Sequence, residues 1–168
     1  MKAQIRDGVF ETASSAVHGL VVSDKGLSPC RLKIEDDCHI HINLDQEFGK
    51  EEKVFTSQKD KLKYIVSWIY SYYDFDEEKI NNGFIWIEFN QVFSEYVNKH
   101  KGTINVNNPY CLGVKVDKCK FKSGYDVFDH QLDPYRGNDG GCVVTLWNPE
   151  KTVEFIFNKY MGLQTGCD

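Results

Sequence analysis

Residues 58–73, QKDKLKYIVSWIYSYY, carry the strongest periodic pattern in the sequence and indicate the class of fold. Along this stretch apolar side chains recur at spacings of three and four residues, at Leu62, Ile65, Val66, Ile69 and Tyr73. Such spacing places them on one stripe of an α-helix. We therefore predict a helix over residues 58–73, capped by Thr56 or Ser57, with its apolar stripe packed on a β-sheet.

Runs typical of β-strands precede this helix, at residues 9–12, at residues 20–23 and within residues 30–44, CRLKIEDDCHIHINL. In the third run two sets of residues alternate along the chain. The apolar set is Cys38, Ile40, Ile42 and Leu44, and the polar set is His39, His41, Asn43 and Asp45. This alternation predicts a strand with one buried face and one face in solvent.

A second helix and further strands are predicted after residue 80. Residues 84–102, FIWIEFNQVFSEYVNKHKG, fit either a buried strand at 84–89 followed by a helix or one long helix, and we favour a helix over residues 87–100. Residues 110–121 alternate like a strand. CVVTLW at 142–147 and TVEFIFNKY at 152–160 are joined by NPEK, which predicts a β-hairpin.

This order of elements predicts an α+β fold, with an antiparallel sheet and about two helices on one of its faces. The chain has 168 residues, of which 41% are hydrophobic. A chain of this size buries about 70% of the surface of its unfolded form, which is enough for one substantial core. We therefore expect residues 1–168 to form a single domain.

The charge and the apolar runs of the chain limit its partners and its compartment. The formal net charge of −5 repels polyphosphate, so nucleic acid is not expected as a direct partner. No run approaches the roughly 20 apolar residues that cross a bilayer, and the first 15 residues lack the features of a secretory signal. We expect a cytoplasmic protein that contacts no membrane and whose six cysteines are reduced.

The first candidate site lies in FETASSAVHGLVV, residues 10–22, and consists of Ser14, Ser15 and His18. These side chains could hold an anion, or His18 could act as a base for one of the serines. Alternatively, the hydroxyls bond to the neighbouring backbone and shape a turn before a strand. The spacing alone favours the turn.

The opening residues 1–22, MKAQIRDGVFETASSAVHGLVV, also resemble the start of small uncharacterised proteins found in phages and prophage-like regions. Those proteins begin with a Gln-Ile-Arg stretch, followed by Val-Phe-Glu-Thr-Asn-Ser-Ser-Ser, a variable residue and His-Ser-Leu. The matching residues here are Val9, Phe10, Glu11, Thr12, Ser14, Ser15, His18 and Leu20, whereas Ala13, Ala16 and Gly19 depart from the pattern. The resemblance implies an origin in a mobile element.

Two further candidate sites combine titratable side chains. His39 and His41 project from the same side of the predicted strand and could share a metal ion, although a solvated polar face, which needs no ligand, is the favoured explanation. The Gly-rich segment 130–144, HQLDPYRGNDGGCVV, offers Arg136 and Asp139 as ligand-binding residues and Cys142 as a nucleophile. A cysteine at the start of a buried strand is more often a small core residue.

The last candidate is the aromatic and acidic segment 68–78, WIYSYYDFDEE. Exposed aromatic rings are frequent anchors at protein interfaces, and an acidic rim steers toward a basic surface. The segment therefore predicts Tyr70, Tyr72 and Phe75 as partner-binding residues. The alternative is that these rings are buried in the core.

No common nucleotide-binding or nucleophile-elbow motif is present in the sequence. These observations favour a binding protein over an enzyme, and we expect no cofactor. The leading hypothesis is a small phage or mobile-element protein that binds and inhibits a host protein with a basic surface, such as a defence or nucleic-acid-processing protein. The alternative is an enzyme or anion-binding module that joins Ser14, Ser15 and His18 to the 130–142 loop. A metalloprotein using His39 and His41 is a third hypothesis.

Overall fold

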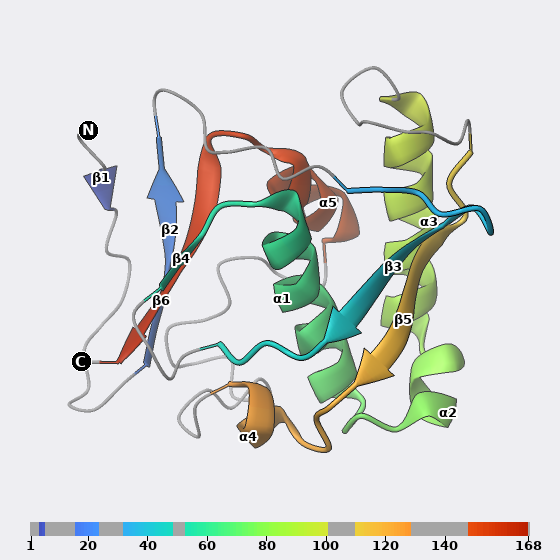
Figure 1. Cartoon of the computed structure of the whole chain (residues 1–168), viewed down its shortest axis with the longest axis horizontal. Coiled ribbons are helices and arrows are strands. Elements are labelled where there is room, and N and C mark those ends of the chain that lie inside the picture. Colours follow the sequence, from blue (N-terminus) through green and yellow to red (C-terminus); the bar gives the residue numbers. More distant parts are fainter. Residues whose placement is uncertain are drawn as a thin grey trace.

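The computed structural model describes residues 4–5, 16–23, 32–48, 53–100, 110–128 and 148–167. Its strands are β1 (Gln4–Ile5), β2 (Ala16–Val22), β3 (His39–Leu44), β4 (Lys53–Phe55), β5 (Gly113–Cys119) and β6 (Met161–Cys167). Its helices are α1 (Gln58–Tyr72), α2 (Glu77–Asn81), α3 (Phe84–Lys99), α4 (Gly124–Val127) and α5 (Pro149–Phe157) (Figure 1). The mixture confirms the predicted α+β class.

The strands form two sheets. One has four antiparallel strands in the order β1-β2-β6-β4, and the other is a parallel pair of β3 and β5. Helix α1 runs between the two sheets, with β3 and β5 on one side and the four-stranded sheet on the other (Figure 1). The parallel pair was not predicted. It arises because the chain passes through α1, α2 and α3 before it returns as β5, and parallel strands need such a long crossover.

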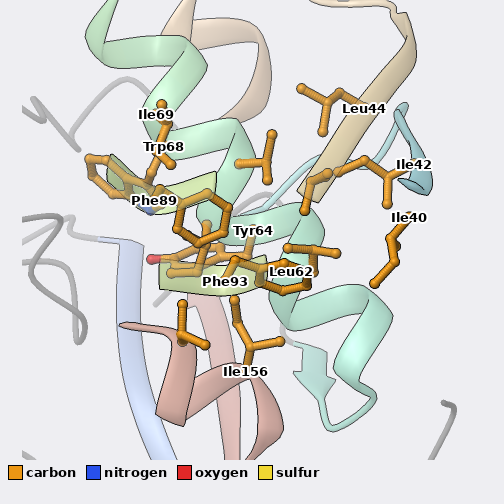
Figure 2. Packing of buried hydrophobic residues seen from close by; sticks show 14 of the residues in the cluster. Ile40, Ile42, Leu44, Leu62, Tyr64, Trp68, Ile69, Phe89, Phe93 and Ile156 are labelled. Carbon is orange, nitrogen blue, oxygen red and sulfur yellow. The ribbon is translucent and has the colours of Figure 1, made fainter. Parts of the chain in front are cut away.

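Helix α1 begins at Gln58, as its periodicity predicts, and it ends at Tyr72, one residue before the predicted end at residue 73. Of the two predicted caps, Ser57 is the observed one: its hydroxyl accepts a hydrogen bond from the backbone N–H of Asp60 at 3.0 Å. The stripe residues Leu62, Ile65 and Ile69 are completely buried. They pack in the core with side chains from β3, α3 and α5 (Figure 2).

Strand β3 has the predicted alternation, with Ile40, Ile42 and Leu44 buried. Its register with β5 shifts between Ile42 and Asn43, which leaves Asp117 as an extra residue in β5. A bulge of this kind redirects a side chain and is frequent beside functional sites. The predicted strand at 110–121 is confirmed as β5, and the one at 20–23 overlaps β2.

Helix α3 confirms the helix predicted over residues 87–100, but it starts earlier, at Phe84, so the alternative of a strand at 84–89 is wrong. The short helix α2 was not predicted. The side chain of Asp76 caps it by accepting hydrogen bonds from the backbone N–H groups of Glu78 and Lys79, at 3.0 and 3.1 Å.

The predicted hairpin of strands 142–147 and 152–160 is wrong in its second arm, which forms helix α5. The side chain of Asn148 caps this helix by accepting from the backbone N–H of Lys151 at 3.0 Å, and Pro149 occupies its first turn, where a missing N–H costs nothing. Residues 142–147 and the predicted strand at 9–12 lie outside the described residues.

One buried cation ties α1 to α5. The Lys61 side chain is 1% exposed, and its ammonium donates to the carbonyl oxygens of Phe155, Asn158 and Met161 at 2.9, 2.8 and 2.9 Å. These three acceptors use all three N–H donors of the ammonium and lie at or just beyond the end of α5, where backbone carbonyls lack helical partners. Burial lowers the pKa of Lys61 to about 8, so that the ammonium is still the main form at neutral pH.

Candidate functional site

Several sequence-predicted site residues lie outside the described part of the chain: Ser14, Ser15, Arg136, Asp139 and Cys142. For His18 only the backbone is described, in β2, where it pairs with Thr165 of β6. The convergence of these residues in one pocket therefore stays a prediction.

His41 lies between two carboxylates on the polar face of the β3–β5 pair. Its Nδ1 is 2.7 Å from an oxygen of Asp117, and its Nε2 is 2.9 Å from both oxygens of Asp37. The bulge in β5 supplies Asp117, and the loop before β3 supplies Asp37, which also binds His39 and Lys115. The geometry therefore gathers the two histidines into an ion-pair network.

The charges in this network favour one another. Hydrogen bonding to Asp37 is the main cause that raises the pKa of His41, and the hydrogen bond from His41 holds the pKa of Asp37 well below its usual range. Both ring nitrogens of His41 are used by carboxylates, so neither has a lone pair free for a metal ion. Within the described residues no group of three or more His, Cys, Asp or Glu side chains is placed to hold a metal.

The predicted partner-binding residues Tyr70, Tyr72 and Phe75 are half-buried and pack against the core. The ring of Tyr70 meets Phe75 edge-on with the centroids 6.2 Å apart, and Phe75 in turn meets Phe121 at 6.4 Å. The burial of the three rings is thus intermediate between the two alternatives, which were exposed anchors and fully buried core rings.

A tight turn joins α1 to α2 at this point. Asp74 and Phe75 have φ angles of 54° and 57°, in the left-handed region that residues other than glycine rarely adopt. The backbone N–H of Phe75 closes the turn by donating to the carbonyl oxygen of Tyr70 at 2.8 Å. Strained backbone of this kind persists only where the surrounding packing holds it, and it often marks functional segments.

Beside this turn the surface opens into a cavity of about 230 Å³, which we call the corner cavity. Tyr70 and Trp86 contribute aromatic rings to its wall, and their centroids are 5.7 Å apart at an angle of 88°. Its polar side chains are Glu77, Asn81 and Lys115, and apolar side chains of α2 and β5 complete the lining. The corner cavity therefore joins the end of α1, α2, the start of α3 and β5.

The titratable groups at the corner cavity suit recognition better than nucleophilic catalysis. Burial, with smaller contributions from the charges of Cys119 and Glu77, raises the pKa of the Tyr70 hydroxyl to about 12. The nearest thiol in β5, that of Cys119, does not line the cavity, and desolvation raises its pKa as well. Both groups are therefore protonated at neutral pH, and a protonated thiol or phenol is a poor nucleophile.

Of the residues that line the corner cavity, Tyr70 was predicted from the sequence as a site residue, whereas Glu77, Asn81, Trp86 and Lys115 were not. Glu77 belongs to the acidic segment 68–78 and could have been included from its position in the sequence. Trp86 and Lys115 carry no local signal, since the fold alone brings them to Tyr70.

Comparison with models of known protein families, with curated proteins and with solved structures finds no match for this chain. Among the described helices, none combines the length and the apolar character needed to span a bilayer.

Proposed function

We propose that this protein acts by binding another protein, and that the contact is made by the corner surface, which we define as residues 70–81 with the corner cavity beside them. The observation that carries the proposal is the position of Tyr70, an aromatic ring that is anchored in the core and also lines an open cavity. Aromatic side chains held in this way expose contact area at little cost in conformational entropy, which is typical of interface anchors.

The charge of the corner surface supports a basic partner. Asp74, Glu77 and Glu78 are exposed there, and the single lysine of the segment, Lys79, lies 3.9 Å from Asp74 and 3.7 Å from Asp76. The surface is therefore acidic in total, as is the chain, with its net charge of −5. Complementary charge raises the rate of association and disfavours acidic partners.

The packing of the corner surface also supports a binding role. Phe75 is held between Tyr70 and Phe121, and the turn that carries it is closed by a backbone hydrogen bond. A surface that is already ordered before it meets its partner loses less entropy on binding than a mobile one. We propose further that the partner is a host protein whose activity is inhibited, in keeping with the resemblance of residues 1–22 to phage and prophage proteins.

Photo-cross-linking tests the proposed surface. A benzophenone amino acid placed at Tyr72 replaces a half-buried ring of the corner surface by another ring. The matched control places it at Tyr160, which is 44% exposed in the turn between α5 and β6. We expect one protein of the source cell to be cross-linked from Tyr72 and not from Tyr160. The same products from both positions, or none from Tyr72, would contradict the proposal.

A further inference from the structure

We infer that the corner cavity receives the positively charged end of one arginine or lysine side chain of the protein partner. This inference rests on the proposed function and adds to it the chemistry of the bound group. It follows from the charge balance of the cavity, from its aromatic wall and from its size.

The charge balance favours a cation. Lys115 is already engaged, with its ammonium 3.3 Å from a carboxylate oxygen of Asp37. Glu77 forms no ion pair with any other residue in the described part of the chain, and its side chain is exposed to solvent at the cavity. The charge left unneutralised in the corner cavity is thus the carboxylate of Glu77, which would attract a cation and repel a phosphate or a carboxylate.

The side chains around the cavity also suit a long basic side chain. Tyr70 and Trp86 both line the cavity and pack edge to face, with centroids 5.7 Å apart, so they hold each other in place at the site that such a side chain would enter. The Tyr70 hydroxyl stays protonated, so it adds an acceptor oxygen without adding a charge. The Asn81 side chain offers an amide oxygen as a further acceptor.

The size of the cavity agrees with a side chain rather than with a whole ligand. Its volume of about 230 Å³ is below the roughly 300–1,000 Å³ of pockets that enclose drug-sized ligands. One long basic side chain needs less room, because its backbone stays outside. The acidic rim formed by Glu78 and Asp74 then faces the rest of a basic partner surface.

Titration of the full chain with small probes, followed by nuclear magnetic resonance, tests the inference. The probes are N-acetyl-arginine methylamide, N-acetyl-lysine methylamide and the neutral analogue N-acetyl-citrulline methylamide. The signal observed is the indole N–H of Trp86, assigned from the spectrum of a Trp86→Phe variant. We expect the arginine or the lysine probe to shift this signal saturably, with a dissociation constant on the order of 1 mM for a single side chain, and the citrulline probe to leave it unchanged.

Two matched variants separate a local contact from a general charge effect. Glu77→Gln and Glu78→Gln each remove one carboxylate from the first turn of α2, so their effects on the helix are alike. Only Glu77 lines the cavity. We expect Glu77→Gln to weaken binding of the cationic probe by about fivefold or more, the loss of a short-range charge contact, and Glu78→Gln to weaken it by less than about twofold.

Equal shifts with arginine and citrulline probes, equal losses in the two variants, or no shift of the Trp86 signal would each overturn the inference. These failures are distinct from failure of the proposed function. If no probe binds but Tyr72 still cross-links to a partner, the inference is wrong and the proposed function stands. If the cationic probes bind but Tyr72 cross-links to nothing, the cavity is a site for a free cation, and the assignment to a partner side chain is wrong.

Discussion

Replacement of Lys61 by Met tests whether a buried ammonium stabilises the junction of α1, α5 and β6. Methionine keeps the length of the side chain and removes the donors that now reach three backbone carbonyls at 2.8–2.9 Å. The acceptors belong to Phe155, Asn158 and Met161, at the end of α5 and the start of β6. The substitution therefore removes the ammonium from all three carbonyls, and those of Phe155 and Asn158 keep only longer backbone hydrogen bonds, from the N–H groups of Asn158 and Met161 at 3.3 and 3.4 Å.

The size of the effect follows from the bonds that are lost. A hydrogen bond to a charged group contributes about 1.5–3 kcal/mol to stability, so three of them at the lower limit amount to about 4.5 kcal/mol. Burial of the apolar methionine side chain returns about 1.5 kcal/mol. The substitution also removes a charge whose burial is unfavourable, as the lowered pKa of Lys61 shows. We therefore expect Lys61→Met to lower the free energy of unfolding by about 1–3 kcal/mol, out of the 5–15 kcal/mol typical of a domain.

Urea unfolding followed by far-ultraviolet circular dichroism measures this loss, with Lys63→Met as the control. Lys63 lies on the same helix and pairs with the exposed carboxylate of Asp45 at 2.7 Å, an interaction worth less than about 1 kcal/mol. Amide hydrogen exchange gives a second measurement: the exchange of Asn158 and Met161 should accelerate in Lys61→Met and not in Lys63→Met. Equal losses of stability in the two variants, with unchanged exchange at α5, would refute the reasoning.

Three further predictions concern other parts of the chain. Gly113→Ala should lower the free energy of unfolding by about 1–3 kcal/mol in a thermal melt, because Gly113 has a φ of 138° and an added Cβ would lie 2.6 Å from the Asn90 side-chain oxygen. Asp37→Asn should reduce the urea midpoint most between about pH 4 and 6.5. The pKa of Asp37 is lowered in the folded state, so the stability that its carboxylate contributes is lost as the pH falls; the pKa of His41 is raised, so the stability that its imidazolium contributes is lost as the pH rises. A difference in urea midpoint that does not depend on pH would contradict this. Phe75→Ala should cost about 1–3 kcal/mol of stability, as for a partly buried ring with aromatic neighbours, and an unchanged melting temperature would show that the ring is not held by the core.

The elements that could be predicted from the sequence are those whose pattern is local. The stripe of α1 and the alternation of β3 each place apolar residues on one face, and the folded chain buries them as predicted. The parallel pairing of β3 with β5 was not predictable in this way. It depends on how the three intervening helices carry the chain back, and no short stretch of sequence records that path.

The error at α5 has a definite physical cause. Thr152, Val153, Phe155 and Ile156 are β-branched or aromatic and favour strands by propensity. These four side chains are nevertheless buried together from one helix, and packing of an apolar face outweighs weak intrinsic preferences. The sequence feature that indicates a helix here is Asn148-Pro149. An asparagine followed by a proline is typical of a helix N-terminus as well as of a turn, and it was interpreted as a turn.

The candidate site could be predicted only in part. Tyr70 and Glu77 belong to one acidic and aromatic segment, so a surface there was foreseeable. Trp86 and Lys115 join them through the packing of α3 and β5, which is a property of the whole fold. The pairing of His41 with Asp117 likewise depends on a bulge that shifts the register by one residue.

The position of β6 in the four-stranded sheet has a consequence for biosynthesis. In this sheet β6 lies between β2 and β4 and pairs with both of them. Both strands come much earlier in the chain than β6, and they are not paired with each other in the sheet. While the ribosome is still translating the segment before β6, β2 and β4 expose unpaired backbone edges, whereas α1, α2, α3 and the β3–β5 pair lie earlier in the chain and can already assemble. Sheet closure is therefore a late, non-local step, and the nascent chain is most exposed to aggregation or chaperone capture just before β6 leaves the exit tunnel.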